Sequence, residues 1–148
     1  MVRRLAPGAT AVLALALSAG PAMGSPEPPA ALRAQLPQAR LAGAARFTYW
    51  GFEVYRARLW VAPGFRPEAW AQHSFALELD YLRSLEGRAI ARRSIEEMQR
   101  AALIAAEQAR AWESAMRSVF PDVKAGDRIT GLHLPGQGAR FLVNGKEA

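Results

Sequence analysis

The spacing of apolar residues changes along this chain, and the change restricts the folds open to it. From Phe75 to Leu82, apolar and polar residues alternate as in a β-strand with one buried and one wet face. After Gly87 the apolar residues recur every three or four positions up to Pro121, which indicates an amphipathic helix, or two helices with a break near 101–104. Strands on both sides of this helical segment predict an α+β fold, with an antiparallel β-sheet and helices packed on one face.

The other expected strands are rich in aromatic and β-branched residues. Segments 43–50 and 52–61 have strong strand propensity, and Gly51 between them is typical of a bulge or a tight bend. Segments 128–134 and 139–143 flank a Pro-Gly-Gln-Gly sequence and form an expected hairpin.

The N-terminus has the pattern of a secretory signal peptide. Two arginines precede an apolar stretch that is too short for a stable membrane anchor. Small residues then stand at positions 22 and 24, three and one before the expected cleavage site. We expect cleavage after Gly24, which divides the chain into a signal peptide (1–24), a Pro-rich lead-in (25–39) and one domain (40–148). Within the lead-in, residues 30–36 form a short helix or stay irregular. The expected location is the periplasm, with no stable membrane anchor after cleavage.

The charge and the absence of cysteine exclude several classes of function. The formal net charge is +6, and removal of residues 1–24 takes away two arginines and no acid, leaving +4. The basic residues are scattered through amphipathic segments rather than gathered in a patch, so nucleic acid is not an expected partner. Without cysteine, the chain has no disulfide, no thiol catalysis and no Cys-ligated metal.

The histidines do not indicate a metal site. His73 and His133 lie sixty residues apart in the sequence and have no spacing typical of metal ligands, and we expect neither a metal nor a cofactor. A triad can be assembled from Ser94, His133 and Asp127, but no nucleophile elbow surrounds any serine. Polar residues with ordinary structural roles are therefore the preferred interpretation.

Two acidic residues share one face of the strand that begins at Phe75. Glu78 and Asp80 are expected on a solvated sheet face, or paired with Arg56 and Arg58 on a neighbouring strand, rather than in acid–base catalysis. The large aromatic residues fit core packing, and they equally fit a ligand cavity between sheet and helices. They are Trp50, Phe52, Trp60, Tyr81 and Trp112.

Four segments, in their order and spacing, resemble the bacterial chalcone isomerase-like proteins. They are GFEVYRARLW from Gly51, FALELDYLR from Phe75, RSIEEM from Arg93 and FPDVKAGD from Phe120. The resemblance covers about 40–145 and implies an open-faced β-sandwich, in which helices lie on a large antiparallel sheet. The family includes plant enzymes that close a chalcone into a flavanone, and non-catalytic members that bind fatty acids.

The resemblance does not extend to the catalytic residues of the plant enzymes, which hold their substrate with an Arg, a Thr, a Tyr and an Asn. The Thr falls on Trp50, the Tyr on Ile90 and the Asn on Glu97. Arg40 and Arg46 are both off register for the Arg. Because the groups that stabilise developing charge on oxygen are not recovered, the resemblance supports the fold and argues against the plant reaction.

Binding is accordingly the first functional hypothesis. An exported, non-catalytic domain would hold a fatty acid or a similar apolar carboxylate, with Arg46 or Arg93 pairing with the carboxylate and Trp50 in the site. Besides binding of a ligand, the residues leave open an interaction protein with an exposed apolar patch and no small ligand.

The alternative is an isomerase, of the intramolecular lyase type, acting on an unknown substrate. Tyr49, Tyr55 or Tyr81 would then supply the acid–base hydroxyl, with a nearby arginine lowering its pKa.

The C-terminus carries a turn signal with little after it. Asn144-Gly145 favours a two-residue hairpin, but only three residues follow. Bacterial relatives carry a further, mainly helical segment, which the resemblance implies this chain lacks. We therefore expect Phe141, Val143 and Tyr81 to be open to water, each forfeiting about 1.5–3 kcal/mol of burial.

Overall fold

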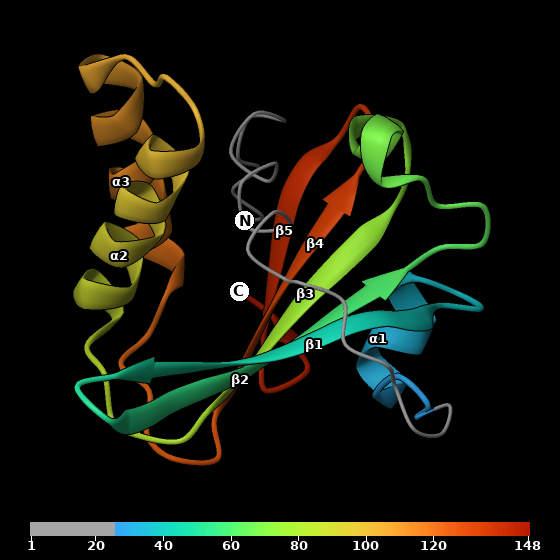
Figure 1. Ribbon diagram of the computed structural model, residues 1–148, viewed down its shortest axis with the longest axis horizontal. Helices are drawn as coiled ribbons and strands as arrows, with labels where there is room; N and C mark the ends of the chain where they lie inside the picture. Colours follow the sequence, from blue (N-terminus) through green and yellow to red (C-terminus); the bar gives the residue numbers. More distant parts are fainter. Residues whose placement is uncertain (1–25) are drawn as a thin grey trace.

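A computed structural model describes residues 26–148, which form one six-stranded antiparallel sheet with the strand order β1-β2-β3-β4-β5-β6 (Figure 1). The elements in chain order are α1 (Ala30–Gln35), β1 (Arg40–Tyr49), β2 (Phe52–Val61), the 3-10 helix η2 (Pro67–Gln72), β3 (Phe75–Tyr81), α2 (Gly87–Ala101), α3 (Ala106–Val119), β4 (Arg128–Leu134), β5 (Gly138–Val143) and β6 (Lys146–Glu147). The predicted α+β class is confirmed. Of the two alternatives for the helical segment, two helices are found, with the break between Ala101 and Ala106. The predicted signal peptide lies outside the described residues.

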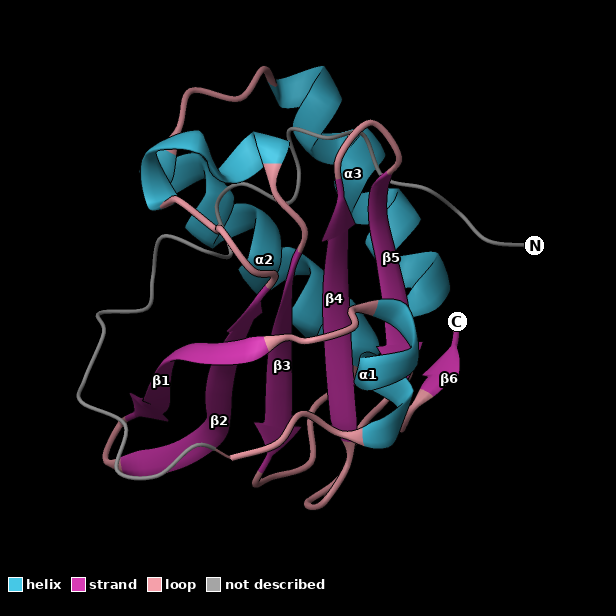
Figure 2. Ribbon diagram, turned by 90° about the vertical axis from the view of Figure 1, so that its right-hand side faces the viewer, coloured by secondary structure: helices cyan, strands magenta, loops and turns pink. Residues whose placement is uncertain are grey.

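The α2–α3 hairpin lies on one face of the sheet, and α1 lies on the other (Figures 1 and 2). Segment 30–36, for which the sequence left two alternatives, thus forms a helix over Ala30–Gln35. Its Leu32 packs with Leu36, Trp60 and Leu132 in a cluster whose members are almost fully buried. None of the helices in the described part of the chain is long and apolar enough to span a membrane.

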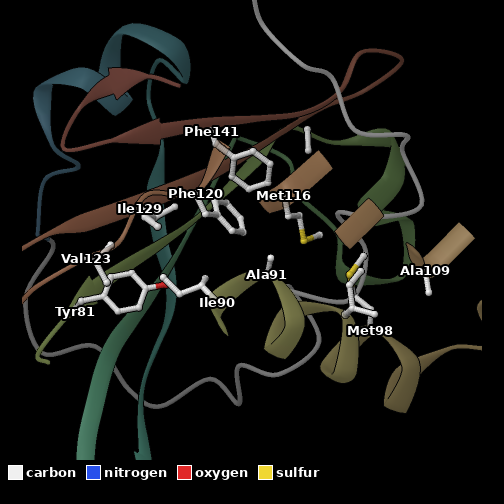
Figure 3. Packing of buried hydrophobic residues seen from close by; sticks show 12 residues of the cluster. Tyr81, Ile90, Ala91, Met98, Ala109, Met116, Phe120, Val123, Ile129 and Phe141 are labelled. Atoms are coloured by element: carbon white, nitrogen blue, oxygen red, sulfur yellow. The ribbon is translucent and has the colours of Figure 1, made fainter. Parts of the chain in front are cut away.

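The main core lies between the α2–α3 hairpin and the sheet (Figure 3). Phe120 meets Phe141 edge to face, with 4.9 Å between ring centroids. Phe141 is 5% exposed and Tyr81 2%, so the expected opening of these side chains to water was wrong. The helices and the segment after α3 cover them, and Val143 is half-buried.

The turn at Asn144-Gly145 also differs from the expectation. It is followed by a short returning strand, because β6 pairs with β5 through Leu142–Glu147 and Val143–Lys146. Arg140 on β5 reinforces this hairpin through an ion pair with Glu147 (2.5 Å between Nη2 and Oε1).

Strand β3 is covered on both faces, whereas its alternating sequence predicted one wet face. Ala76 is buried under α1, and Glu78 has no exposed surface at all. Of the two arrangements expected for these acids, a solvated face or pairing with arginines, the pairing is found: Arg58 on β2 pairs with Glu78 (3.0 Å between Nε and Oε1) and with Asp80. Arg128 on β4 closes the network from the other side, with its Nε 2.6 Å from Asp80 Oδ1. Arg56 lies opposite Asp80 in the register but is exposed.

The β1–β2 hairpin turns tightly at Trp50 and Gly51, both of which have positive φ (52° and 78°). Of the bulge and the tight bend that were expected at Gly51, the tight bend is found. The pairing of the two strands is irregular between Phe47 and Thr48. Phe47 pairs with Tyr55 and Thr48 pairs with Glu53, so Val54 has no partner on β1. A bulge of this kind turns a side chain out of the regular alternation.

Candidate functional site

A groove with a volume of about 320 Å³ lies between the β1–β2–β3 part of the sheet and α2. Its wall is mainly apolar, and the apolar members come from the strands, from the loop after β3 and from α2. They are Phe47, Val54, Leu79, Leu85, Ala89 and Ile90. The volume is at the small end of the range for ligand pockets, and an apolar wall with a few polar groups is typical of such sites.

Three aromatic residues form a row across the sheet at the base of the groove. The register aligns Phe47 of β1 with Tyr55 of β2, and Tyr55 with Tyr81 of β3. Phe47 stacks on Tyr55 at 5.1 Å between centroids, and Tyr55 meets Tyr81 edge to face at 6.0 Å. Because Val54 is bulged, it lines the groove next to Tyr55 instead of alternating to the other face.

The rim of the groove is charged and comes from α2. Arg93 pairs with Glu97 (2.6 Å between Nη2 and Oε1) and more loosely with Glu96 (3.7 Å), and its guanidinium lies 5.3 Å from the centroid of Phe47. Arg92 also lines the groove, is exposed, and forms no ion pair with any residue in the described range. One arginine of the rim is thus neutralised, and the other is free to bind an anion.

Burial is the main cause of the pKa shifts of two tyrosines that line the groove, Tyr55 and Tyr81. Burial raises the pKa of Tyr55, Glu97 raises it further, and Arg93 lowers it by less than these two effects combined. Burial also raises the pKa of Tyr81 far above its ordinary value, with Tyr55 adding to the effect. Arg93 thus acts on the pKa of Tyr55 in the expected direction, but burial and Glu97 outweigh it. Both hydroxyls stay protonated at neutral pH, as hydrogen-bond donors.

The structure brings together four of the six residues predicted for the site. Tyr49, Tyr55, Tyr81 and Arg93 all line the groove. The other two lie outside it. Arg46 is exposed and binds Glu53 (2.6 Å between Nη1 and Oε1), and Trp50 is 82% exposed at the hairpin turn.

Sequence reasoning missed Arg92 and Phe47. Arg92 lies outside the apolar stripe of the predicted amphipathic helix, and the groove uses part of that side of α2 as its wall. Ile90 and Glu97, where the resemblance placed the plant Tyr and Asn, both line the groove.

The three residues of the candidate triad have structural contacts instead. Ser94 donates to the carbonyl of Ile90, and Asp127 accepts hydrogen bonds from the Lys124 amide and from Asn144. His133 stacks on Phe75 at 4.9 Å. Within residues 26–148, no three His, Cys, Asp or Glu side chains are grouped so as to hold a metal ion.

Comparison with known proteins identifies the fold. No protein-family model and no curated protein sequence matches this chain. Among solved structures, the crystal structure of a fatty-acid binding protein from Arabidopsis thaliana matches with a TM-score of 0.52 and 11% sequence identity, over 75% of this chain and 71% of that one. The chain has the chalcone isomerase-like fold. At 11% identity the likeness concerns the fold alone, because one fold hosts many functions.

Proposed function

We propose that this protein binds a fatty acid or a similar apolar carboxylate in the groove, without catalysis. The observation that carries the proposal is an apolar groove over an aromatic row, with an unpaired arginine at its rim. The chalcone isomerase-like fold, which it shares with a protein that binds fatty acids, is consistent with this function. We further propose that it is an exported, periplasmic relative of the bacterial chalcone isomerase-like proteins, on the basis of its N-terminal pattern and the four matching segments.

The groove suggests how such a ligand is held. The hydrocarbon lies against Val54, Leu79 and Ile90, where each buried CH₂ contributes about 0.8 kcal/mol. The carboxylate reaches the rim, where Arg92 is free and Arg93 exchanges Glu97 for the ligand. Arginine suits this role because its planar fork binds a carboxylate through two parallel hydrogen bonds.

Burial argues against the isomerase alternative for two of its three candidate tyrosines, Tyr55 and Tyr81. A general acid–base group works best with a pKa near the operating pH. Burial moves the pKa values of Tyr55 and Tyr81 upward, away from that range. These hydroxyls orient a bound oxygen by donating a hydrogen bond, but they are poor bases.

Filling the groove is expected to abolish binding. Ala89 is half-buried in the wall, and Ala89→Phe places a ring in the space meant for the hydrocarbon. We expect the affinity for a fluorescent fatty acid, measured by titration, to fall at least about ten-fold, since burial of a few CH₂ groups is lost. The melting temperature should change little. Ala111→Phe on the exposed side of α3 is the matched control. Equal binding by the Ala89 and Ala111 variants would place the ligand elsewhere.

Recognition of the carboxylate is expected to depend on the rim arginines. Arg92→Gln should weaken binding of a fatty acid about ten-fold, because a hydrogen bond to a charged group contributes about 1.5–3 kcal/mol. Binding of the fatty alcohol of the same length should not change, since it carries no charge. Arg110→Gln, on the exposed side of α3 and outside the groove lining, is the control. If the acid and the alcohol lose affinity equally, the arginine does not read the carboxylate.

A further inference from the structure

Three aromatic side chains at the tip of the β1–β2 hairpin are exposed. Trp50 is 82% exposed, Tyr49 58% and Phe52 57%, and we call these three residues the aromatic tip. The hairpin extends away from the other strands, so its turn lies at the edge of the molecule (Figure 1). Large aromatic side chains gathered at such an edge indicate a surface that meets another apolar phase.

The turn itself does not require a tryptophan. Trp50 and Gly51 have φ of 52° and 78°, and the two-residue turn at Asn144-Gly145 has nearly the same values, 50° and 82°. Asn-Gly is the pair that favours this geometry, whereas a bulky residue at positive φ is strained. Trp50 is nearly fully exposed and so gains little from packing that would compensate the strain. Contact with another molecule explains the presence of Trp50 at this turn better than the stability of the fold does.

The charges around the aromatic tip are mainly positive. Arg83 lies over the Phe52 ring, 4.4 Å from its centroid, and forms no ion pair in the described part of the chain. Arg46 and Arg56 are exposed on the same hairpin, and Glu53 is the acid beside them, paired with Arg46. Aromatic rings next to arginines suit the headgroup region of a bilayer, where the rings lie among the headgroups and the cations meet anionic lipids.

We propose that the aromatic tip docks this protein onto a membrane surface that contains anionic lipids. Tyr49 belongs both to the aromatic tip and to the lining of the groove, so docking by the tip places the groove beside the lipid. A second copy of the chain fits this surface less well, because two tips would bring their arginines together. The proposal goes beyond fatty-acid binding and does not depend on it.

The test compares binding to vesicles of phosphatidylcholine alone and of phosphatidylcholine with phosphatidylglycerol, by co-sedimentation. We expect wild type to bind the anionic vesicles more strongly. Trp50→Asn, which gives the turn its favoured Asn-Gly pair, should keep or raise the melting temperature and reduce vesicle binding about ten-fold. Arg83→Gln should reduce binding about five-fold on anionic vesicles only. Leu103→Asn is the control, because Leu103 is more exposed than Trp50 but lies in the α2–α3 loop.

Several outcomes would overturn the proposal. One is wild-type vesicle binding by the Trp50 variant, and another is an equal loss in the Leu103 control. A dimer in size-exclusion chromatography that the Trp50 variant dissolves, with no vesicle binding by wild type, would assign the surface to a second copy. Fatty-acid binding is measured separately without vesicles and should be unchanged in Trp50→Asn. Its failure in wild type would overturn the proposed function and leave the docking proposal standing.

Discussion

Replacement of Gly87 by alanine is expected to destabilise the protein by about 3 kcal/mol or more. A Cβ atom at this position would lie 2.8 Å from the carbonyl oxygen of Pro121 and 2.9 Å from the carbonyl carbon of Phe120, and backbone atoms cannot move aside as a flexible side chain does. The helix propensity gained by alanine, about 1 kcal/mol, does not offset this clash. Chemical denaturation of the variant and wild type measures the difference.

The same substitution should also affect the groove. Gly87 is the first residue of α2, and its N–H donates to Asp122 Oδ1 at 2.8 Å, which ties the start of the helix to the segment after α3. If α2 shifts, the groove wall formed by Ala89 and Ile90 shifts with it, and fatty-acid affinity falls. Arg88→Ala is the control, since Arg88 is the exposed next residue. A Gly87→Ala variant as stable as this control would show that the close approach is not a constraint.

Much of the fold was predictable because local periodicity identifies the elements. The alternation after Phe75 and the helical spacing after Gly87 located β3, α2 and α3 almost to the residue. Periodicity does not show which elements pack against each face of a strand. The alternation in β3 correctly separates two sets of side chains, but Ala76 and Glu78 are buried because α1 and two arginines from other strands cover the second face.

The site was predictable in kind and only partly in its members. Tyrosines on adjacent strands were obvious candidates, and Tyr55 and Tyr81 meet in the groove because the register pairs them. The net rise of their pKa values was not predictable, since the depth of burial depends on the tertiary structure. Trp50 was assigned to the ligand site as a large aromatic, whereas a position in a two-residue turn leaves it in solvent.

Removal of Arg58 is expected to cost about 3 kcal/mol, because it leaves the charge of Glu78 buried with one weaker partner. Glu78 is completely buried, and its remaining neighbour would be Arg128, whose Nη1 is 3.7 Å from Glu78 Oε2. Arg58→Met keeps most of the aliphatic stem and isolates the loss of charge. The control is Arg56→Met, two residues away on the same strand, where the arginine is exposed and no ion pair is broken.

The double variant Arg58→Met/Glu78→Gln separates charge from packing. If the cost comes from the buried charge, the second substitution should restore most of the stability, because no unpaired carboxylate is then left inside. If the double variant is as unstable as Arg58→Met alone, the loss reflects packing of the arginine stem instead. Urea denaturation of the four proteins gives the coupling directly.

The pH dependence of the Arg58→Met cost provides an independent check. Burial raises the pKa of Glu78 in the folded protein, against the opposing effects of Arg128 and Arg58, and loss of Arg58 raises it further. As the pH falls, a carboxyl with a raised pKa takes up its proton in the folded state before it does so in the unfolded state. Acidification therefore removes the cost of burying its charge. Burial also raises the pKa of Asp80, but hydrogen bonds from Arg128 and Arg58 lower it more in wild type, and Arg128 still binds Asp80 when Arg58 is replaced. The cost of Arg58→Met should therefore be full near pH 7 and shrink as the pH falls toward about 4.5. A cost that grows on acidification would contradict the assignment to Glu78.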